Sequence, residues 1–465
     1  GNVRLKHKET FMTCDSAHFY PDRDLVEAYS NVHIFRGDTL HLYGAYLLYD
    51  SNAELAYVRD SVILIDNETT LYTDKIDYDM IRETATYTTG GRIINEDNVL
   101  TSIIGIYHTE REVFNFKDSV KLINPDYTMY SDTLEYNTVT EVAYFLGPSR
   151  VIGDSLYVRC RRGWYDTKNE VSLLLDDAFI DNEVQVVSGD SLYYESENGF
   201  GTAFYNVTIT DKKEDIIVKG NESWYYRDPE RFMITDSAQF IQVSDDDYLY
   251  LHADTLRSVT LSDTISISDT ISSGDSVFTY RLVRAFYGCR IFSEDIQAKC
   301  DSLSYSFKDS VIRLYYNPVL WSDANQLFAD SMALITRNQQ MHKMELYNNS
   351  FVIEEVDSTR YNQLKGKNLF GYFEDNKLYK IEIRGNSEKI YFAVDENQLV
   401  GVDKSTCADM DIYLEEGKIR EIYMLGSPKG TLDPPLHRPP SLRRLEDFSW
   451  YEALRHKNRF DIFRK

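Results

Sequence analysis

The sequence lacks several features that would assign it to common functional classes. No run approaches the roughly 18 consecutive apolar residues that a membrane-spanning helix needs. The five cysteines are widely spaced and include no Cys-x-x-Cys pair, so neither a zinc site nor a dense disulfide framework is indicated, and we interpret them as small apolar core residues. Lysine and arginine total 50 against 75 aspartate and glutamate residues, a net charge of −25. Because nucleic-acid binders present basic faces to phosphates, no nucleic-acid partner is expected.

Patterns that carry catalysis are also missing. The nine histidines are scattered without metal-ligand spacing, and the sequence contains no nucleophile elbow, phosphate-binding loop or metal motif. The many aspartates recur at fixed places in a repeat, which favours a structural role over converging acids and bases in a cleft. The sequence therefore predicts a protein that is not an enzyme and uses no cofactor or metal.

What the sequence does contain is an internal repeat of about 29 residues. Its 36 tyrosines and 23 phenylalanines suit the pleated, half-buried surfaces of strands. One aromatic residue closes a strand-like segment in each repeat, at steps of 29 to 31 residues: Phe19, Tyr49, Tyr78, Tyr107, Tyr136, Tyr165, Tyr194 and Tyr225. A second column, at steps of 28 to 31 residues, comprises Val32, Val62, Arg92, Val120, Arg150, Ala178, Val207 and Ala238.

The repeated segments share a local pattern. Ser131–Tyr136 and Gly189–Tyr194 have the order small, Asp, Ser or Thr, apolar, any residue, Tyr, and Thr73–Tyr78 differs only at its third place. The apolar residue and the tyrosine are two apart, so they share one face of a strand. We expect the Asp-Ser or Asp-Thr pair at the strand entrance, where it would set a turn. Each repeat is predicted to supply two short strands, one per column, and stacked repeats would build two facing sheets.

The pattern divides the chain into four segments. Residues 12–258 and 282–431 are expected to form the β-array, and residues 259–281 a polar, low-complexity loop. Residues 432–465 are expected to form a Pro-rich linker and an amphipathic helical tail, because Leu442, Leu445, Phe448, Tyr451 and Leu454 recur every three residues. The tail would either cap the open end of the array or dock on a partner or membrane surface.

Two sheets that meet along one side and splay along the other would enclose a long apolar trough, which suits acyl chains. The inward-facing candidates for lipid binding are Ile76, Tyr78, Leu134, Tyr136, Leu192, Tyr194, Val32, Ile34, Val62, Leu64, Val120, Leu122, Val207 and Ile209. If they line a trough, Leu134→Asp should abolish lipid binding while the array stays folded. The residues alone leave open whether the interior is filled by side chains. A packed β-repeat scaffold or adhesin-type envelope protein without lipid is therefore the alternative.

The segments Cys300–Tyr305, Ser131–Tyr136 and Gly189–Tyr194 resemble the repeat of the OstA-like family, relatives of LptA and of the amino-terminal domain of LptD. The stretch 369–392, with its Gly371-Tyr372-Phe373 and Gly385-Asn386-Ser387 segments, is similar to the same family. The resemblance implies an all-β fold, an elongated twisted β-jellyroll open along a seam, here followed by a short helical C-terminal tail. It also implies that the jellyroll shields the lipid A acyl chains of lipopolysaccharide in the periplasm of a Gram-negative bacterium, and it leaves outer-membrane association open. Other jellyroll-containing transport proteins would be partners through end-to-end strand pairing.

Overall fold

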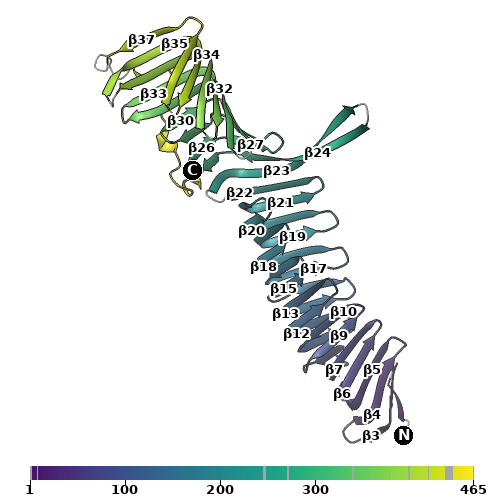
Figure 1. Cartoon of the computed structure of the whole chain (residues 1–465). Helices are drawn as coiled ribbons and strands as arrows, with labels where there is room; N and C mark the ends of the chain where they lie inside the picture. The colour runs from purple at the N-terminus through teal and green to yellow at the C-terminus, as the bar shows by residue number, and fades with distance from the viewer. Residues whose placement is uncertain are drawn as a thin grey trace. The chain divides into compact units, whose positions relative to one another are not determined.

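The fold is described from a computed structural model. It describes residues 3–7, 9–243, 248–269, 272–337, 340–375, 377–395, 398–416, 418–434 and 443–463. The chain divides into two compact units, unit 1 (residues 1–213) and unit 2 (residues 214–465). Both are built almost entirely from antiparallel strands, which confirms the expected all-β class (Figure 1).

Unit 1 contains twenty strands among its described residues. They are β1 (Val3–His7), β2 (Thr10–Cys14), β3 (Ser16–Tyr20), β4 (Leu25–Arg36), β5 (Leu40–Asp50), β6 (Leu55–Asp66), β7 (Thr69–Asp79), β8 (Thr84–Tyr87), β9 (Gly91–Asn95), β10 (Asn98–Ser102), β11 (Ile104–His108), β12 (Val113–Ile123), β13 (Tyr127–Asn137), β14 (Val142–Phe145), β15 (Ser149–Gly153), β16 (Leu156–Cys160), β17 (Arg162–Asp166), β18 (Val171–Asn182), β19 (Gln185–Glu195) and β20 (Phe200–Asp211).

Unit 2 continues the same pattern with longer hairpins. Its elements are β21 (Ile216–Arg227), β22 (Glu230–Val243), β23 (Tyr248–Asp269), β24 (Ser272–Phe286), β25 (Cys289–Phe292), β26 (Ile296–Cys300), β27 (Ser302–Ser306), β28 (Val311–Tyr315), β29 (Val319–Ser322), β30 (Asn325–Phe328), β31 (Ser331–Arg337), β32 (Gln340–Asp357), β33 (Arg360–Glu374), β34 (Lys377–Asp395), β35 (Gln398–Glu415), β36 (Lys418–Leu425), β37 (Lys429–Asp433) and the 3-10 helices η2 (Glu452–Leu454) and η3 (Asp461–Phe463). No helix in the described part of the chain is long and apolar enough to cross a membrane.

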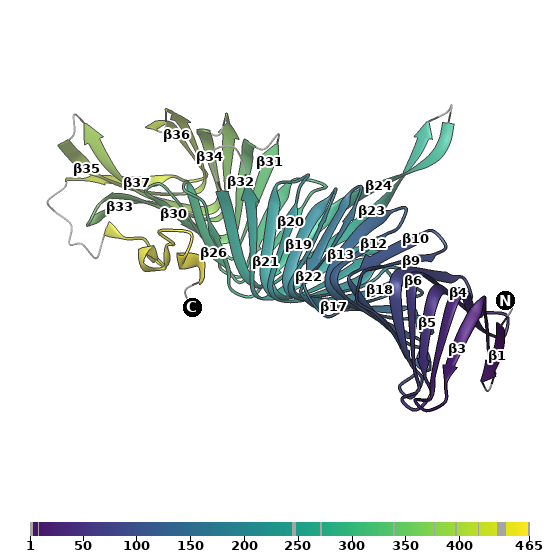
Figure 2. The same cartoon turned by 90° about the horizontal axis from the view of Figure 1, so that it is seen from below.

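Long strands such as β6 and β7 bend sharply at a corner near the middle of their length. In the β6–β7 pair, Arg59 lies opposite Lys75 and Val62 opposite Thr73, so Asp60 and Ser61 face a single residue across the corner. Both corner residues have a left-handed backbone, with φ of 66° and 53°. Equivalent register shifts occur in β4, β12, β18 and β22. The half-strands on the two sides of the corners form two sheets, and the bends are visible in Figure 2. Sheet A holds halves such as residues 55–59 and 75–79, and sheet B holds halves such as residues 62–66 and 69–73.

Asp74, Asp132 and Asp190 of the repeat motif lie within β7, β13 and β19, which corrects the expected position at a strand entrance, whereas Asp15, Asp301 and Asp330 directly precede β3, β27 and β31 as predicted. In both cases the aspartate lies at the corner. Its carboxylate accepts a hydrogen bond from an asparagine amide of the neighbouring strand, and the distance is 2.8 Å for Asn31 Nδ2 to Asp15 Oδ2. The same contact joins Asn206 to Asp190 at 3.2 Å and Asn349 to Asp330 at 3.0 Å. Asparagine tolerates the left-handed backbone better than most residues, and its side chain ties adjacent corners together.

Residues 259–269 and 272–281 lie in paired strands where the sequence predicted a polar loop. Strands β23 and β24 pair continuously from Thr255–Phe286 to Asp269–Ser272, although residues 270–271 and the side chains of residues 264–277 lie outside the description. The reason is visible in the sequence, where β-branched residues alternate with serine in Thr264-Ile265-Ser266-Ile267. That period of two is a strand signal, and it outweighs the polar composition.

The carboxyl-terminal tail also differs from its prediction. In the described residues 443–463, helical structure consists of the single 3-10 turns η2 and η3 and a 3-10 position at Arg443, and the other residues are irregular. Leu442 lies outside the described residues. The apolar side chains spaced by three residues therefore do not form one face of a continuous helix, and they contact the β-structure individually.

All five cysteines lie at corners, in the buried row of small residues of sheet B. Cys14, Cys160, Cys289, Cys300 and Cys407 are between 0% and 8% exposed, and none forms a disulfide. The two sheets approach each other closely at the corners, so only small side chains fit there. The interpretation of the cysteines as small apolar core residues is confirmed.

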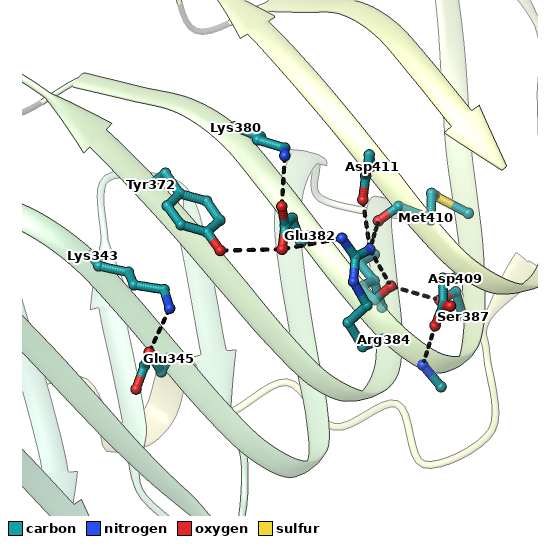
Figure 3. A network of polar contacts seen from close by, with 12 residues as sticks. Lys343, Glu345, Tyr372, Lys380, Glu382, Arg384, Ser387, Asp409, Met410 and Asp411 are labelled. Carbon is teal, nitrogen blue, oxygen red and sulfur yellow. Dashed lines mark hydrogen bonds and ion pairs between the residues drawn. The ribbon is translucent and has the colours of Figure 1, made fainter. Parts of the chain in front are cut away.

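The outer face of sheet A in unit 2 carries a charged network (Figure 3). Glu382 is its centre: the carboxylate accepts hydrogen bonds from Lys380 at 2.6 Å and Tyr372 at 3.1 Å and pairs with Arg384 at 3.1 Å. Arg384 also reaches Asp411 at 2.5 Å. Such a face is solvated, which makes the apolar inner rows the place where an apolar ligand could bind.

Candidate functional site

An uninterrupted row of aliphatic side chains runs across sheet B on the inner side of unit 1. Its members are direct cross-strand neighbours, so each contacts the next across the roughly 4.8 Å strand spacing. We call this the aliphatic row: Met12, Ile34, Leu42, Leu64, Leu71, Ile93, Leu100, Leu122, Met129, Val151, Val158, Ile180, Val187 and Ile209. No member is polar, so the inner side of this sheet presents a continuous hydrocarbon surface.

Sheet A presents a row of different chemistry, in which aromatic side chains mostly alternate with small ones. We call this the aromatic row: Phe19, Val26, Tyr49, Ala56, Tyr78, Ala85, Tyr107, Phe114, Tyr136, Ala143, Tyr165, Ser172, Tyr194 and Gly201. A Cβ on Gly201 would lie 3.2 Å from the Tyr194 ring, which shows how little room remains beside an aromatic neighbour. The 29-residue aromatic column of the sequence is therefore a physical row, spaced by small residues that make room for the rings.

The predicted lipid-binding residues divide into two groups by depth. Seven lie next to the corners and are between 1% and 4% exposed: Val32, Val62, Val120, Val207, Ile76, Leu134 and Leu192. The other seven lie two residues further from the corner and are half-buried: Ile34, Leu64, Leu122, Ile209, Tyr78, Tyr136 and Tyr194. Exposure thus increases away from the corners, as it does where two sheets separate. The first group forms core, and only the second group is placed to contact a ligand.

The burial of the Leu134 side chain changes the expected outcome of the substitution Leu134→Asp. The side chain is 2% exposed and packs in the corner between Phe116 and Phe145. An aspartate there would be an unpaired buried charge, which costs several kcal/mol or protonates. The substitution would disturb the fold itself, so it does not separate ligand binding from folding.

The interior narrows in the middle of unit 1. Tyr107 is 9% exposed, stacks on Phe114 at a ring distance of 4.1 Å, and donates a hydrogen bond across the interior to Asp66 Oδ2 of sheet B at 3.3 Å. Phe114 occupies a place in the aromatic row where other repeats have valine, alanine, serine or glycine. Opposite, Leu71 and Ile93 are 6% and 7% exposed. We call Tyr107, Phe114 and Asp66 the constriction.

Polar side chains border the aliphatic row on its open side. Asn95 donates to Thr69 Oγ1 at 2.7 Å, and Asn124 donates to Asn98 Oδ1 at 2.9 Å. At the hairpins of sheet A, a glutamate with left-handed backbone recurs at a spacing of 29 residues: Glu54, Glu83, Glu112, Glu141 and Glu170. The cross-section of unit 1 is therefore amphipathic, apolar inside and polar at the rim.

Burial also affects the ionisation of three tyrosines in the aromatic row. Burial raises the pKa of Tyr136 and Tyr165, and burial followed by the Asp66 carboxylate raises the pKa of Tyr107. The hydroxyl groups therefore remain hydrogen-bond donors. In the described part of the chain, no group of three or more His, Cys, Asp or Glu residues is arranged to hold a metal ion.

Sequence reasoning missed ten members of the aliphatic row, among them Leu42, Leu71, Val151 and Val158. The columns followed one strand of each repeat, whereas each repeat adds two strands to each sheet. A search for apolar residues two places from every corner would have found them, because the corners themselves have a sequence signature.

Comparisons with known proteins give a family for the first part of the chain. Residues 1–132 match the sequence model of the family described as OstA-like protein. The amino-terminal segment is similar to this family. The OstA-like segment ends within β13, so it includes the constriction and the row members from Met12 to Met129. The same two rows continue to Gly201 and Ile209 beyond it.

One similar solved structure is that of LptH, the LptA-homologous periplasmic component of the lipopolysaccharide transport device from Pseudomonas aeruginosa. It is 14% identical, the match covers 29% of this chain and 80% of LptH, and the TM-score is 0.16. A search of curated proteins gave no match.

Proposed function

We propose that unit 1 binds the acyl chains of a lipid of the lipopolysaccharide (lipid A) type and takes part in its transport through the periplasm. The observation that carries the proposal is the pair of facing inner rows, aliphatic on sheet B and aromatic on sheet A. The OstA-like match of residues 1–132 supports the same class of protein. The role needs no catalysis and no cofactor.

The physical basis for binding is burial of hydrocarbon. Each Å² of apolar surface removed from water contributes about 25 cal/mol, so an acyl chain laid along several half-buried row members gains affinity without specific polar contacts. The polar rim would keep a sugar or phosphate head group outside the trough. Because neither of the two inner rows contains a charged side chain, the trough would discriminate by shape and apolarity.

End-to-end assembly belongs to the same proposal. Among the described residues, strand β1 pairs with β2, from Val3–Cys14 to His7–Thr10, and with no other strand, and we propose its second edge as the place for pairing with another chain. Another jellyroll-containing protein could add a strand there. Periplasmic location, with or without outer-membrane association, follows as part of the proposed role.

The test uses two consecutive residues of β15 that point to opposite faces. Val151 is a half-buried member of the aliphatic row, whereas Ile152 is 43% exposed on the outer face. The wild type and the variants Val151→Asp and Ile152→Asp would be purified from a lipopolysaccharide-producing host, and bound lipid would be quantified by native mass spectrometry and organic extraction. We expect glycolipid on the wild type and on Ile152→Asp, and at least a tenfold loss on Val151→Asp.

Circular dichroism and thermal unfolding of both variants provide the folding control. Equal lipid content in two folded variants would contradict a trough at the aliphatic row. A wild-type protein that carries no lipid and takes up no added lipopolysaccharide would favour the packed scaffold. At the constriction, side chains already fill the interior in this way.

A further inference from the structure

The carboxyl-terminal tail follows one cross-strand row on the outer face of sheet B in unit 2. This row, which we call the groove row, is Ile241, Tyr250, Phe292, Gln297, Trp321, Gln326, Ile353, Gln363 and Ile390. Tail residues 443–445 contact Gln363, residues 449–451 contact Gln326, Arg455 contacts Gln297 and Ile462 packs with Ile241 and Tyr250. The tail (yellow) lies beside β26 and β30 in Figures 1 and 2.

Two glutamines hold the tail backbone in the same way. Gln363 donates from Nε2 to the Arg443 carbonyl at 2.9 Å and accepts at Oε1 from the Leu445 N–H at 2.8 Å. Gln326 donates to the Ser449 carbonyl at 2.7 Å and accepts from the Tyr451 N–H at 2.6 Å. Each side-chain amide therefore pairs with the C=O of one residue and the N–H of the residue two places later, as a neighbouring strand would. These contacts involve backbone atoms of the tail and are independent of its side chains.

Burial of these amides requires a partner. Gln326 is 0% exposed and Gln363 is 1% exposed. A buried amide without hydrogen bonds is destabilising, whereas an apolar residue of similar size would pack without this penalty. Elsewhere in unit 2 the outer face is charged, as around Glu382 on sheet A. The groove row combines apolar side chains with two side-chain amides, of Gln326 and Gln363, that hydrogen-bond the tail backbone. This composition is suited to holding an extended peptide.

Apolar side chains of the tail occupy adjacent positions along the groove. Leu445 is 4% exposed and belongs to the cluster that contains Phe351, Ile353 and Ile390. Phe448 and Trp450 lie against the Tyr361 ring at centroid distances of 5.3 Å and 5.1 Å. At the far end Ile462 is 0% exposed and its carbonyl accepts from Arg290 Nη1 at 3.0 Å. The tail contributes anchors at both ends and backbone pairing between them.

We propose that the groove row is a peptide-binding site, which recognises extended backbone through Gln326 and Gln363, and that residues 443–463 occupy it as an exchangeable intramolecular ligand. The chemical class of ligand is an extended peptide with apolar residues at the places of Leu445, Phe448 and Trp450. The proposal concerns unit 2 alone and does not depend on lipid binding by unit 1.

The experiment separates the tail from the chain after folding. A protease site is inserted between Pro434 and Arg443 of the full-length protein, the folded protein is cleaved, and native mass spectrometry measures how much tail stays bound. A fluorescein-labelled synthetic peptide of residues 443–463 is then added, and its uptake is followed by fluorescence anisotropy. We expect one tail retained per chain and saturable exchange with the labelled peptide.

Substitutions distinguish backbone recognition from passive packing. Gln326→Leu and Gln363→Leu keep the volume and remove the hydrogen bonds, and Gln242→Leu, at an exposed position of β22, is the matched control. We expect at least a tenfold weaker hold on the peptide for each groove variant and no change for the control. Peptides N-methylated at Leu445 or Tyr451 should show the same loss. Release of the wild-type tail on cleavage, or leucine variants that bind as tightly as the wild type, would overturn the proposal.

Discussion

Gly44 of β5 lies at a corner where the next strand leaves no room for a side chain. A Cβ built on Gly44 would lie 2.5 Å from Cγ1 of Val58, which is 0% exposed. Valine is stiff at χ1, so it cannot rotate away without strain. Gly220 has the same relation to Ile234 at 2.6 Å, so the same close approach recurs at a second corner.

We expect Gly44→Ala to lower the free energy of unfolding by about 1–3 kcal/mol through overpacking. Chemical denaturation followed by circular dichroism would measure the change. In the double variant with Val58→Ala the added methyl group has space, so part of the loss should be recovered. Additive effects of the two substitutions would show that the contact does not limit packing at this corner.

His456 makes tail docking sensitive to pH. The side chain is 7% exposed, and its Nε2 has no hydrogen-bond partner among the described residues. Burial, followed by the charge of Arg290, lowers the pKa of His456 to about 4, while Asp461 opposes the shift and Lys299 adds to it. Because the folded pKa is below the unfolded value of about 6.5, the neutral histidine stabilises the docked tail fully above pH 6.5, and this contribution falls as the pH drops toward 4.

The loss at the acid end should reach about 3 kcal/mol, from a shift of roughly 2.5 pKa units at 1.36 kcal/mol each. Hydrogen exchange of residues 443–463 at pH 7.5 and pH 5 would measure the part of this loss already present at pH 5, about 2 kcal/mol, as weaker protection at the lower pH after correction for intrinsic exchange rates. His456→Phe should flatten this dependence. An unchanged pH profile in that variant would assign the effect to other groups.

At the scale of the strand, the sequence predicted more of the fold than of the site. The 29-residue columns correspond to cross-strand rows in the structure. The constant spacing between corners keeps every repeat in the same register. The constriction was not predictable, since Phe114 looks like any other strand aromatic until its place among Ala85, Ala143 and Ser172 is known. Tyr87 is similar: its ring lies over Gly91 and Gly105, whose Cβ positions would come within 2.5 Å and 2.3 Å of it, and its hydroxyl bonds Ser102 at 2.6 Å.

The constriction predicts opposite effects of two substitutions in the aromatic row. Phe114→Ala removes the ring that stacks on Tyr107 and should widen the interior, at about 2 kcal/mol of stability, less than the roughly 3–5 kcal/mol for a fully buried phenylalanine. Lipid retention should increase. Ala143→Phe places a ring at the equivalent position between Tyr136 and Tyr165 and should reduce it. Both effects are measured as glycolipid per chain by native mass spectrometry. Glycolipid content that changes in the same direction in both variants would show that the aromatic row does not bind the lipid.

At the scale of the whole molecule, each repeat of unit 1 contacts mainly its neighbours in sequence. The register of β13, for example, involves β12 on one side and β14 and β15 on the other. Stability in such arrays is close to a sum of local terms and nearest-neighbour interfaces, so damage should stay local. The one cross-sheet bond described above, from Tyr107 to Asp66, also links strands that are close in the array.

Leu134→Asp is therefore expected to open the array around β13 and leave its amino-terminal end intact. The charge sits at a position that is 2% exposed, next to Phe116 and Phe145, and should cost several kcal/mol locally. Hydrogen exchange read by mass spectrometry should show lost protection in β12, β13 and β14 and unchanged protection in β4–β6. The exposed substitution Val139→Asp, in the turn after β13, is the control and should change neither region. Loss of protection spread evenly over residues 3–213 would mean that unit 1 unfolds as one cooperative body, and lipid binding would then depend on every corner of the array at once.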